Sequence, residues 1–268
     1  MDALRLGPIV LPWAPLLLVL GYVVAVWIAG SEHKARRGNA EPALLPLLVL
    51  ALIVARAVFV LRHSADYTSA LAMIDVRDRG FDTLAGWVAA AAGVAFWAWW
   101  QPALRRSLPL SAAAGAAIVL AGMGLLTLLQ PPRPPLPVLT LQSLDGPPLA
   151  LTSLRGQPLV LNLWATWCPP CRRELPMLIQ AARQEQGAHI VLVNEGDTAQ
   201  RVAAYLQDQR LGKPEVLLDP DSRLLSYYRS PGLPTTLFIA ADGSVQSVHI
   251  GELSAATLQQ GIAQLRGR

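Results

Sequence analysis

The stretch WATWCPPCRRELP, residues 164–176, contains both cysteines of the chain and decides the fold. It overlaps the end of the run PLVLNLW (158–164), a continuous apolar segment of the kind buried in the middle of a sheet. Proline is tolerated in the first turn of a helix, so a helix is predicted to begin near Pro169. Cys168 then lies at the amino end of that helix, where free backbone N–H groups and the helix dipole stabilise a thiolate.

The spacing of the two cysteines predicts thiol-disulfide exchange. The thiolate is the nucleophile in this chemistry, so Cys168 is the predicted attacking thiol. Cys171 follows one helical turn later, beneath Cys168 and less exposed, where it can attack the mixed disulfide and release the reduced partner. The alternative is a pair of buried, unreactive cysteines. The spacing, the helix-start position and the flanking Trp167 favour exchange.

Composition argues against several other classes of function. The formal net charge is only +4 over 268 residues and the arginines form no basic stripe, so no nucleic-acid partner is predicted. Two cysteines supply neither a disulfide scaffold nor the four ligands of structural zinc. No metal site is predicted from the histidines, which lie in apolar or strand-like runs: His33, His63, His189 and His249. No cofactor is predicted beyond the redox-active disulfide of the two cysteines.

Strand and helix patterns alternate through the carboxy-terminal half. The helix from Pro169 should be kinked at Pro176. Further strands are predicted at 189–194, 215–219, 235–240 and 244–250, the last two joined as a hairpin by Ala241-Asp242-Gly243, and further helices at 198–210, 222–228 and 254–265. This order predicts a mixed α/β sheet with helices on both faces.

The first half of the chain reads as a helical membrane domain, residues 1–129. Four apolar stretches approach the roughly 20 residues that cross a bilayer core: Pro8–Ala29, Ala43–Leu61, Leu84–Trp100 and Leu108–Leu129. A cleaved signal peptide is the alternative for the first, but its apolar core is longer than usual. The proline-rich segment QPPRPPLP (130–137) is the predicted linker, a semi-rigid spacer before a second domain at 138–268.

Charge in the loops indicates the orientation of the four spans. With the amino terminus outside, the cytoplasmic loops carry Lys34, Arg36, Arg37, Arg105 and Arg106. This small excess of basic residues follows the positive-inside rule. An even number of spans returns the chain to its starting side, so the second domain is expected outside as well.

The motif WATWCPPC, the strand before it and the later Gly232-Leu233-Pro234-Thr235 resemble the thioredoxin superfamily, in its membrane-tethered branch of TlpA, ResA and CcmG (DsbE) type proteins. The resemblance covers about residues 136–268. It implies a thioredoxin-like fold, thiol-disulfide oxidoreductase activity and a location outside the cytoplasmic membrane.

The resemblance also assigns roles to individual residues. Cys168 matches the nucleophile and Cys171 the resolving thiol, and Glu174 matches an acidic residue thought to exchange a proton with Cys171. The peptide bond between Leu233 and Pro234 is expected to be cis. For Glu174 the alternative is a solvated helix charge paired with a neighbouring arginine.

Substrate contacts follow from the same resemblance. The loop at Pro234 would face the dithiol and pair with an extended partner segment through backbone hydrogen bonds. Trp167, Leu233 and Thr235 are therefore the expected substrate-binding residues. One departure is Asn162, six residues before the first cysteine, where cytoplasmic thioredoxin has a buried aspartate; Glu174 is the remaining candidate for proton exchange.

The membrane half resembles part of prolipoprotein diacylglyceryl transferase more weakly, over residues 55–87. It lacks the His-Gly-Gly signature of that family. Arg56, inside a predicted span, indicates a polar or lipid-headgroup contact, with snorkelling to the interface as the alternative. Residues 1–130 contain no cysteine, unlike electron-conducting DsbD or CcdA type proteins, so a separate membrane thiol donor of that type is the predicted source of electrons.

The predicted function is a multi-pass protein of the bacterial inner membrane whose thioredoxin-like domain faces the periplasm. It would reduce disulfides in periplasmic proteins or in apocytochrome c during cytochrome c biogenesis, while the spans contact the lipid bilayer. The alternatives are a disulfide-forming oxidase, a degenerate transferase-like membrane protein with an accessory thiol domain, and a non-catalytic interaction module.

Overall fold

The computed structural model describes residues 3–6, 9–35, 38–67, 70–129, 132–184 and 187–266. The chain divides into two compact units, one of residues 1–64 with 80–131 and one of residues 65–79 with 132–268. Some residues used in the sequence predictions lie outside the described ranges, namely Pro8, Arg36, Arg37, Gln130 and Pro131.

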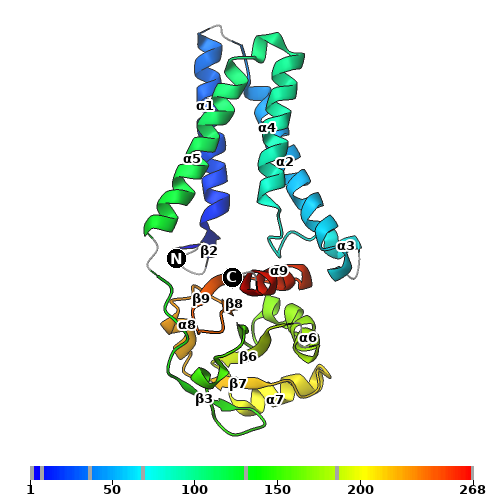
Figure 1. The fold of residues 1–268 in the computed structure, drawn as a ribbon, viewed down its shortest axis with the longest axis vertical. Helices are drawn as coiled ribbons and strands as arrows, with labels where there is room; N and C mark the ends of the chain where they lie inside the picture. The colour runs from blue at the N-terminus through cyan, green and yellow to red at the C-terminus, as the bar shows by residue number, and fades with distance from the viewer. Residues whose placement is uncertain are drawn as a thin grey trace. The chain divides into compact units, whose positions relative to one another are not determined.

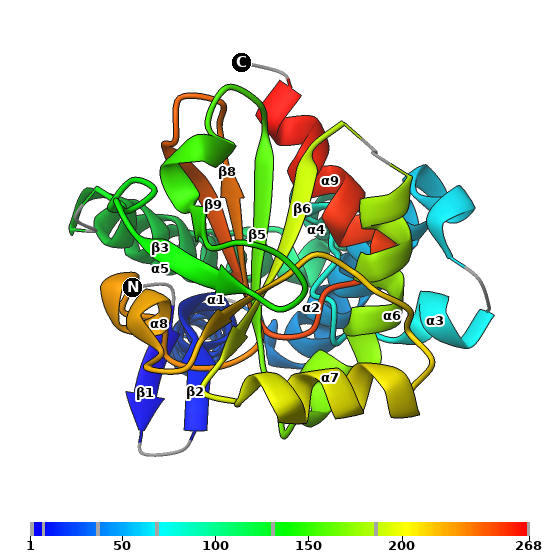
Figure 2. The same cartoon turned by 90° about the horizontal axis from the view of Figure 1, so that it is seen from below.

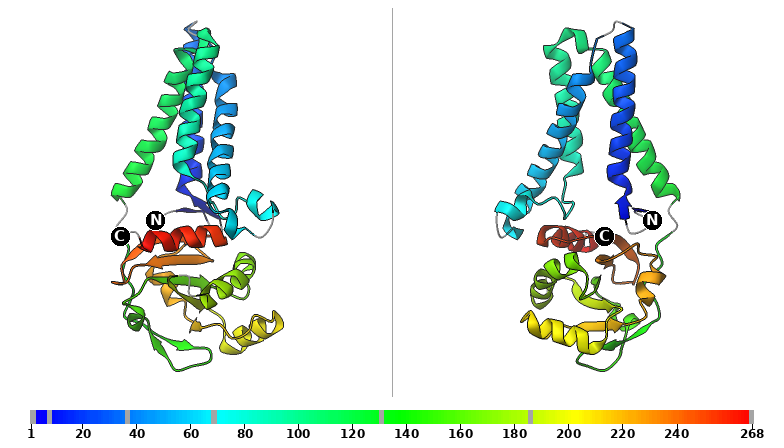
Figure 3. Two further views of the ribbon diagram at one scale, coloured as in Figure 1. Left: turned by 45° about the vertical axis from the view of Figure 1, so that its right-hand side comes forward. Right: turned by 180° about the vertical axis from the view of Figure 1, so that it is seen from behind.

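The first unit is built on four long helices, α1 (Trp13–Lys34), α2 (Glu41–Arg62), α4 (Thr83–Trp100) and α5 (Ser107–Leu129). Each is long and apolar enough to cross a membrane. Helix α1 packs against α5 and α2 against α4, as Figures 1 and 3 show. The short helix η2 (Pro102–Leu104) precedes α5 in this unit. Between α2 and α4 the chain forms η1 (Ser64–Asp66), at the boundary of the two units, and α3 (Ala70–Ile74), which belongs to the second unit.

The first helix begins later than the sequence predicted. Residues Ala3–Leu6 (β1) and Ile9–Pro12 (β2) pair as antiparallel strands, so the prediction that residues 9–12 belong to the first span is wrong. Pro12 has extended backbone angles (φ −62°, ψ 145°) and precedes the first helical residue, Trp13. Ile9 and Val10 have β-branched side chains, which suit a strand. They are also apolar, so hydrophobicity alone did not separate them from the helix that follows.

Arg56 lies inside α2 and contacts the chain's own backbone. Its guanidinium Nη1 donates to the carbonyl oxygen of Gly80 at 2.8 Å and lies 5.8 Å from the ring centre of Phe59. The side chain is buried, at 9% exposure, so the polar contact that the sequence indicated is made within the protein. Asp82 caps α4 by accepting from the N–H of Ala85. These contacts fix the turn that leads into α4.

The second unit contains a seven-stranded mixed sheet in the order β4-β3-β7-β6-β5-β8-β9. Strands β5, β6 and β7 are parallel, and the other neighbouring pairs are antiparallel. The strands are β3 (Thr140–Ser143), β4 (Leu149–Ala150), β5 (Leu159–Trp164), β6 (His189–Glu195), β7 (Val216–Asp219), β8 (Thr235–Ile239) and β9 (Val245–Ile250).

Helices cover both faces of this sheet, as the sequence predicted. One face packs on α6 (Pro169–Arg183), α7 (Ala199–Asp208) and α9 (Ala255–Arg266). The other packs on α8 (Arg223–Tyr227) and on the short helix η3 (Leu151–Leu154). Figure 2 shows α6 and α9 on one side of the sheet and α8 on the other. Strand β5 is buried along its whole length, because both of its faces are covered.

Strands β3 and β4 and helix η3 were not predicted from the sequence.

The described part of the proline-rich segment packs on the sheet. Leu136 is buried, at 2% exposure, and its N–H donates to the carbonyl oxygen of Gly243. The guanidinium of Arg133 donates to the carbonyl oxygen of Gln246 at 2.9 Å. Residues 133–136 therefore belong to the second unit and are not a free spacer.

Candidate functional site

The two cysteines lie where the sequence predicted them, between the central strand and its following helix. Strand β5 ends at Trp164, and Cys168 is the N-cap of α6. Its sulfur accepts a hydrogen bond from the N–H of Cys171 at 3.3 Å. The two are joined as a disulfide and are buried, at 3% and 0% exposure. The first sulfur is therefore at the end of α6 that the helix dipole makes positive.

Trp167 and the proline loop provide the surroundings of the pair. Trp167 is 63% exposed, and a large exposed ring next to a reactive group suits contact with a partner. The peptide bond between Leu233 and Pro234 is cis, which confirms that expectation. Leu233 packs against the apolar cluster that contains both cysteines. The loop and the dithiol therefore share one core.

The structure corrects the role expected of Thr235. Its side chain is fully buried, and its hydroxyl donates to the carbonyl oxygen of Gly232 at 2.7 Å and lies 2.6 Å from the hydroxyl of Ser230. Its backbone pairs with β5 and β9. Thr235 therefore shapes the proline loop from inside and offers no side-chain surface to a substrate.

Glu174, on the dithiol helix α6, is buried in a hydrogen-bonded network. It is 3% exposed, so the alternative of a solvated helix charge is wrong. Its carboxylate accepts from the amide of Asn162 at 2.9 Å and from the N–H of Leu253 at 2.7 Å. Burial raises the pKa of the Glu174 carboxyl to about 8, although these two hydrogen bonds oppose the rise. A carboxyl with this pKa can both take up and release a proton near neutral pH.

Asn162 connects Glu174 to the strand that follows the proline loop. Its amide also donates to the hydroxyl of Thr236 at 2.9 Å, and the Asn162 side chain is completely buried. The position that holds a buried aspartate in cytoplasmic thioredoxin therefore holds the partner of Glu174 here. Sequence reasoning noted the substitution but did not find this contact, because the two residues lie on different elements.

A charged cluster next to this network was missed from the sequence. The carboxylate of Glu252 accepts from Arg173 at 2.9 and 2.6 Å. Arg77, from the segment between α2 and α4, lies 3.9 Å from the same carboxylate. Glu252 directly precedes Leu253, the donor to Glu174. No local pattern links Arg77 to Glu252, because 175 positions separate them and only the fold brings them together.

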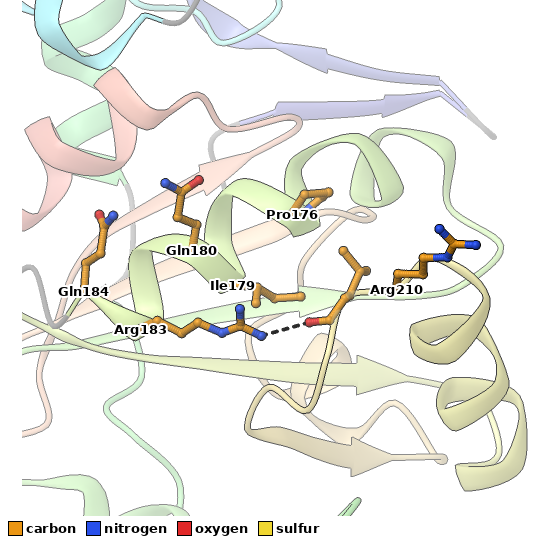
Figure 4. A pocket seen from close by; sticks show the side chains of 7 residues that line it. Pro176, Ile179, Gln180, Arg183, Gln184 and Arg210 are labelled. Atoms are coloured by element: carbon orange, nitrogen blue, oxygen red, sulfur yellow. Dashed lines mark hydrogen bonds between the residues drawn. The ribbon is translucent and has the colours of Figure 1, made fainter.

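Groups of metal-ligating side chains and hollows of the surface are two further features that can mark a site. Within the described ranges, no group of three or more His, Cys, Asp or Glu side chains is arranged to hold a metal ion. A shallow hollow of about 400 Å³ lies along the second half of α6 (Figure 4), where Arg183 donates to the carbonyl oxygen of Leu211. Its lining includes neither cysteine: Pro176, Ile179, Gln180, Arg183, Gln184, Arg210 and Leu211.

Known proteins share this second unit. Residues 132–248 match the AhpC/TSA family. The thiol-disulfide oxidoreductase ResA of Geobacillus thermodenitrificans is 31% identical over 132 residues, which are 48% of this chain and 75% of that protein. The thiol:disulfide interchange protein DsbE of Escherichia coli K12 is 35% identical over 136 residues, 49% of this chain and 71% of that protein.

The chain belongs to the ResA and DsbE family. It is accordingly a thiol-disulfide oxidoreductase with a thioredoxin-like domain after four apolar helices. Among solved structures, a secreted Mycobacterium tuberculosis disulfide oxidoreductase homologous to E. coli DsbE is 27% identical, covering 48% of this chain and 96% of that one with a TM-score of 0.43. The resemblance of residues 55–87 to prolipoprotein diacylglyceryl transferase is not shown by these matches, which concern the carboxy-terminal half.

Proposed function

We propose that Cys168 and Cys171 are the redox-active pair with which this chain reduces disulfides of proteins outside the bacterial inner membrane. The observation that carries this proposal is the position of Cys168 at the N-cap of α6, directly after the buried central strand. Trp167, the residue before it, is exposed, and Leu233 of the cis-proline loop packs against the apolar cluster that contains both cysteines. Substrates of this site are disulfide-bonded periplasmic proteins or apocytochrome c.

The exchange proceeds in two balanced steps. In the first, the thiolate of Cys168 attacks one sulfur of a substrate disulfide, that bond breaks, and the departing substrate thiolate takes up a proton. In the second, Cys171 loses its proton and attacks the sulfur of Cys168, which releases the second substrate thiol. The substrate gains two electrons and two protons, and the pair ends as the disulfide present in the structure.

Glu174 is the proposed proton acceptor for Cys171. The two residues are three positions apart on α6, and side chains at this spacing lie on one face of a helix. The pKa of the Glu174 carboxyl, raised by burial to about 8, lies close to neutral pH, where proton exchange with a thiol is most effective. Asn162 and the N–H of Leu253 hold the carboxylate in place.

Recharging the pair requires two electrons from another dithiol. The four helices carry no cysteine, so a separate membrane protein of DsbD or CcdA type is the proposed donor. The Cys168–Cys171 disulfide is the proposed redox carrier, without a further cofactor. This division of labour assigns the membrane half of the chain to anchoring in the lipid bilayer.

A multi-pass arrangement in the inner membrane, with the second unit in the periplasm, accounts for the organisation of the chain. Four helices are long and apolar enough to span. Residues 65–79 come after the second of these helices, and residues 132–268 come after the fourth. Both segments belong to one compact unit. Two further spans between them return the chain to the same side of a membrane, which supports four crossings.

Trapping of the mixed disulfide in the host bacterium tests the proposed function. The full chain with Cys171→Ser should accumulate covalent complexes with substrate proteins, because the second step is blocked, and dithiothreitol should release them. Cys168→Ser is the matched control and should trap none. Cytochrome c precursors or other periplasmic thiols should become more oxidised in the Cys168→Ser strain. Complexes formed equally by both variants, or thiols that become more reduced without Cys168, would contradict the proposal; the second result would indicate a disulfide-forming oxidase.

A further inference from the structure

Asp197 holds the turn that carries the dithiol. It follows β6, and its carboxylate accepts from the backbone N–H of Thr166 at 2.8 Å and from the hydroxyl of Thr166 at 3.0 Å. Thr166 lies in the turn between β5 and α6, two residues before Cys168. The amide of Asn194 donates to the same carboxylate at 3.0 Å. One side chain thus fixes both the backbone and the side chain of the active-site turn.

The carboxylate of Asp197 is also buried, and it is bonded to a residue only two positions from Cys168. The residue is 2% exposed. Its basic neighbour, Arg201, lies 3.5 Å from one oxygen, but the Arg201 side chain is 67% exposed, so solvent screens this ion pair. A negative charge near a thiol disfavours the thiolate, and a disfavoured thiolate makes the disulfide form relatively more stable.

We propose that Asp197 is a positioning residue for thiol exchange, which fixes the turn before Cys168 and keeps the Cys168–Cys171 pair reducing through its negative charge. This inference rests on the proposed role of Cys168 as the attacking thiol. Asp197 itself touches no reacting atom and acts through Thr166 and through the local electrostatic potential. Its charge opposes the effect of the α6 dipole at the same position.

Replacement by asparagine separates the charge from the geometry. Two donors, the Thr166 N–H and the Asn194 amide, meet the same oxygen, Oδ2. An asparagine oxygen placed there keeps both hydrogen bonds. Its NH2 group then occupies the place of Oδ1 and can donate to the hydroxyl of Thr166, which accepts as well as donates. Asp197→Asn therefore removes the charge and leaves the turn anchored.

The matched control is Asp219→Asn. Asp219 is a fully buried carboxylate at the end of the adjacent strand β7, where it accepts from the N–H of Leu224 at 2.8 Å. No described contact joins it to the dithiol turn. A purely structural role for Asp197 predicts that the two variants affect the redox equilibrium alike.

The experiment compares both variants with the unaltered full chain in detergent micelles. The redox equilibrium against dithiothreitol at pH 9 should shift about tenfold toward the dithiol in Asp197→Asn, which corresponds to about 30 mV. The pH at which Cys168 is half alkylated by iodoacetamide should fall by about one unit. Asp219→Asn should change neither quantity by more than about twofold or 0.3 pH unit. Equal values for the two variants would overturn the inference.

Thr166 provides a second test, which does not depend on the folding of the Asp197 variant. Thr166→Val keeps the charge and the backbone bond but loses the hydroxyl bond, and it should slow resolution of a mixed disulfide at least about fivefold. Thr166→Ser should restore the rate. A Thr166→Val chain at the unaltered rate would refute the positioning role. The Cys168→Ser chain separates this inference from the proposed function. If thiol exchange survives in Cys168→Ser, the proposed function is refuted as well. If exchange is lost in Cys168→Ser but the redox equilibrium of Asp197→Asn is unchanged, only the Asp197 inference is refuted.

Discussion

The buried carboxyl of Glu174 should make the second unit less stable as the pH rises from about 4.5 to about 8. Burial raises the pKa of this carboxyl from 4.5 to about 8 in the folded chain. In this window the folded chain holds a proton that the unfolded chain has lost, so the free energy of unfolding falls with rising pH. One such proton accounts for at most about 1.4 kcal/mol per pH unit. Between pH 5 and 7 the loss is therefore up to about 2.5 kcal/mol.

Glu174→Gln removes this ionisation with little change of shape. The new amide oxygen can accept from the N–H of Leu253, and the new NH2 group faces Asn162. The Oδ1 atom of Asn162 has no hydrogen-bond partner among the described residues, so a turn of its amide presents an acceptor to that NH2 group. The variant should therefore keep its packing and lose up to about 2.5 kcal/mol of the pH dependence between pH 5 and 7.

Hydrogen exchange measured by mass spectrometry on the oxidised full chain in micelles isolates this effect from the membrane half. Peptides from β5 (159–164) and β6 (189–195) report opening of the sheet, after correction for the intrinsic pH dependence of exchange. The opening free energy should fall more steeply with pH in the unaltered chain than in Glu174→Gln. Identical slopes would show that Glu174 is already ionised at pH 5 when folded, and would refute its assignment as a proton acceptor near neutral pH.

Three further outcomes follow from the structure. Burial and a neighbouring carboxylate also raise the pKa of Glu195 to about 8. Glu195→Gln should therefore make the opening free energy less dependent on pH without changing thiol exchange. An unchanged pH dependence would contradict this. A Cβ on Gly115 would meet a backbone oxygen of α1 at 2.7 Å, whereas one on Gly124 has open space. Gly115→Ala should therefore lower the thermal midpoint of the full chain by several degrees and Gly124→Ala should not; equal midpoints would contradict the close packing of α1 on α5. Arg56→Leu removes a buried hydrogen bond to Gly80 and should lower the free energy of unfolding by about 1–3 kcal/mol. Hydrogen exchange at residues 80–86 should become faster. Unchanged exchange there would contradict the role of Arg56 in fixing the turn before α4.

The sequence was sufficient to predict most of the second unit, because its elements carry strong local signals. The run before Trp164 and the prolines after Cys168 mark a buried strand and a helix start, and both boundaries agree with the structure to within a residue. The strands β3 and β4 escaped prediction because they are four and two residues long and pair at the edge of the sheet. Such short edge strands depend on their neighbours and have little periodicity of their own.

The contacts that tune the site could not be predicted from local patterns. Glu174 was expected from resemblance, but its partner Leu253 lies 79 positions later, and the Asp197 carboxylate that holds Thr166 lies 31 positions later. Neither pair falls within one helix or strand, so periodicity contains no information on it. The same holds for Arg56, whose charge indicated a polar contact without identifying the Gly80 carbonyl, 24 positions away, as the acceptor.

The reduction potential of the Cys168–Cys171 pair tests the central claim most directly. The full chain in micelles is equilibrated with dithiothreitol or glutathione at defined ratios, and the fraction of reduced pair is read by mass after alkylation. A reductase of disulfides requires a potential near or below that of thioredoxin, about −270 mV, and this is the value expected. A potential near that of DsbA, about −120 mV, would make the chain a disulfide-forming oxidant and would contradict the account.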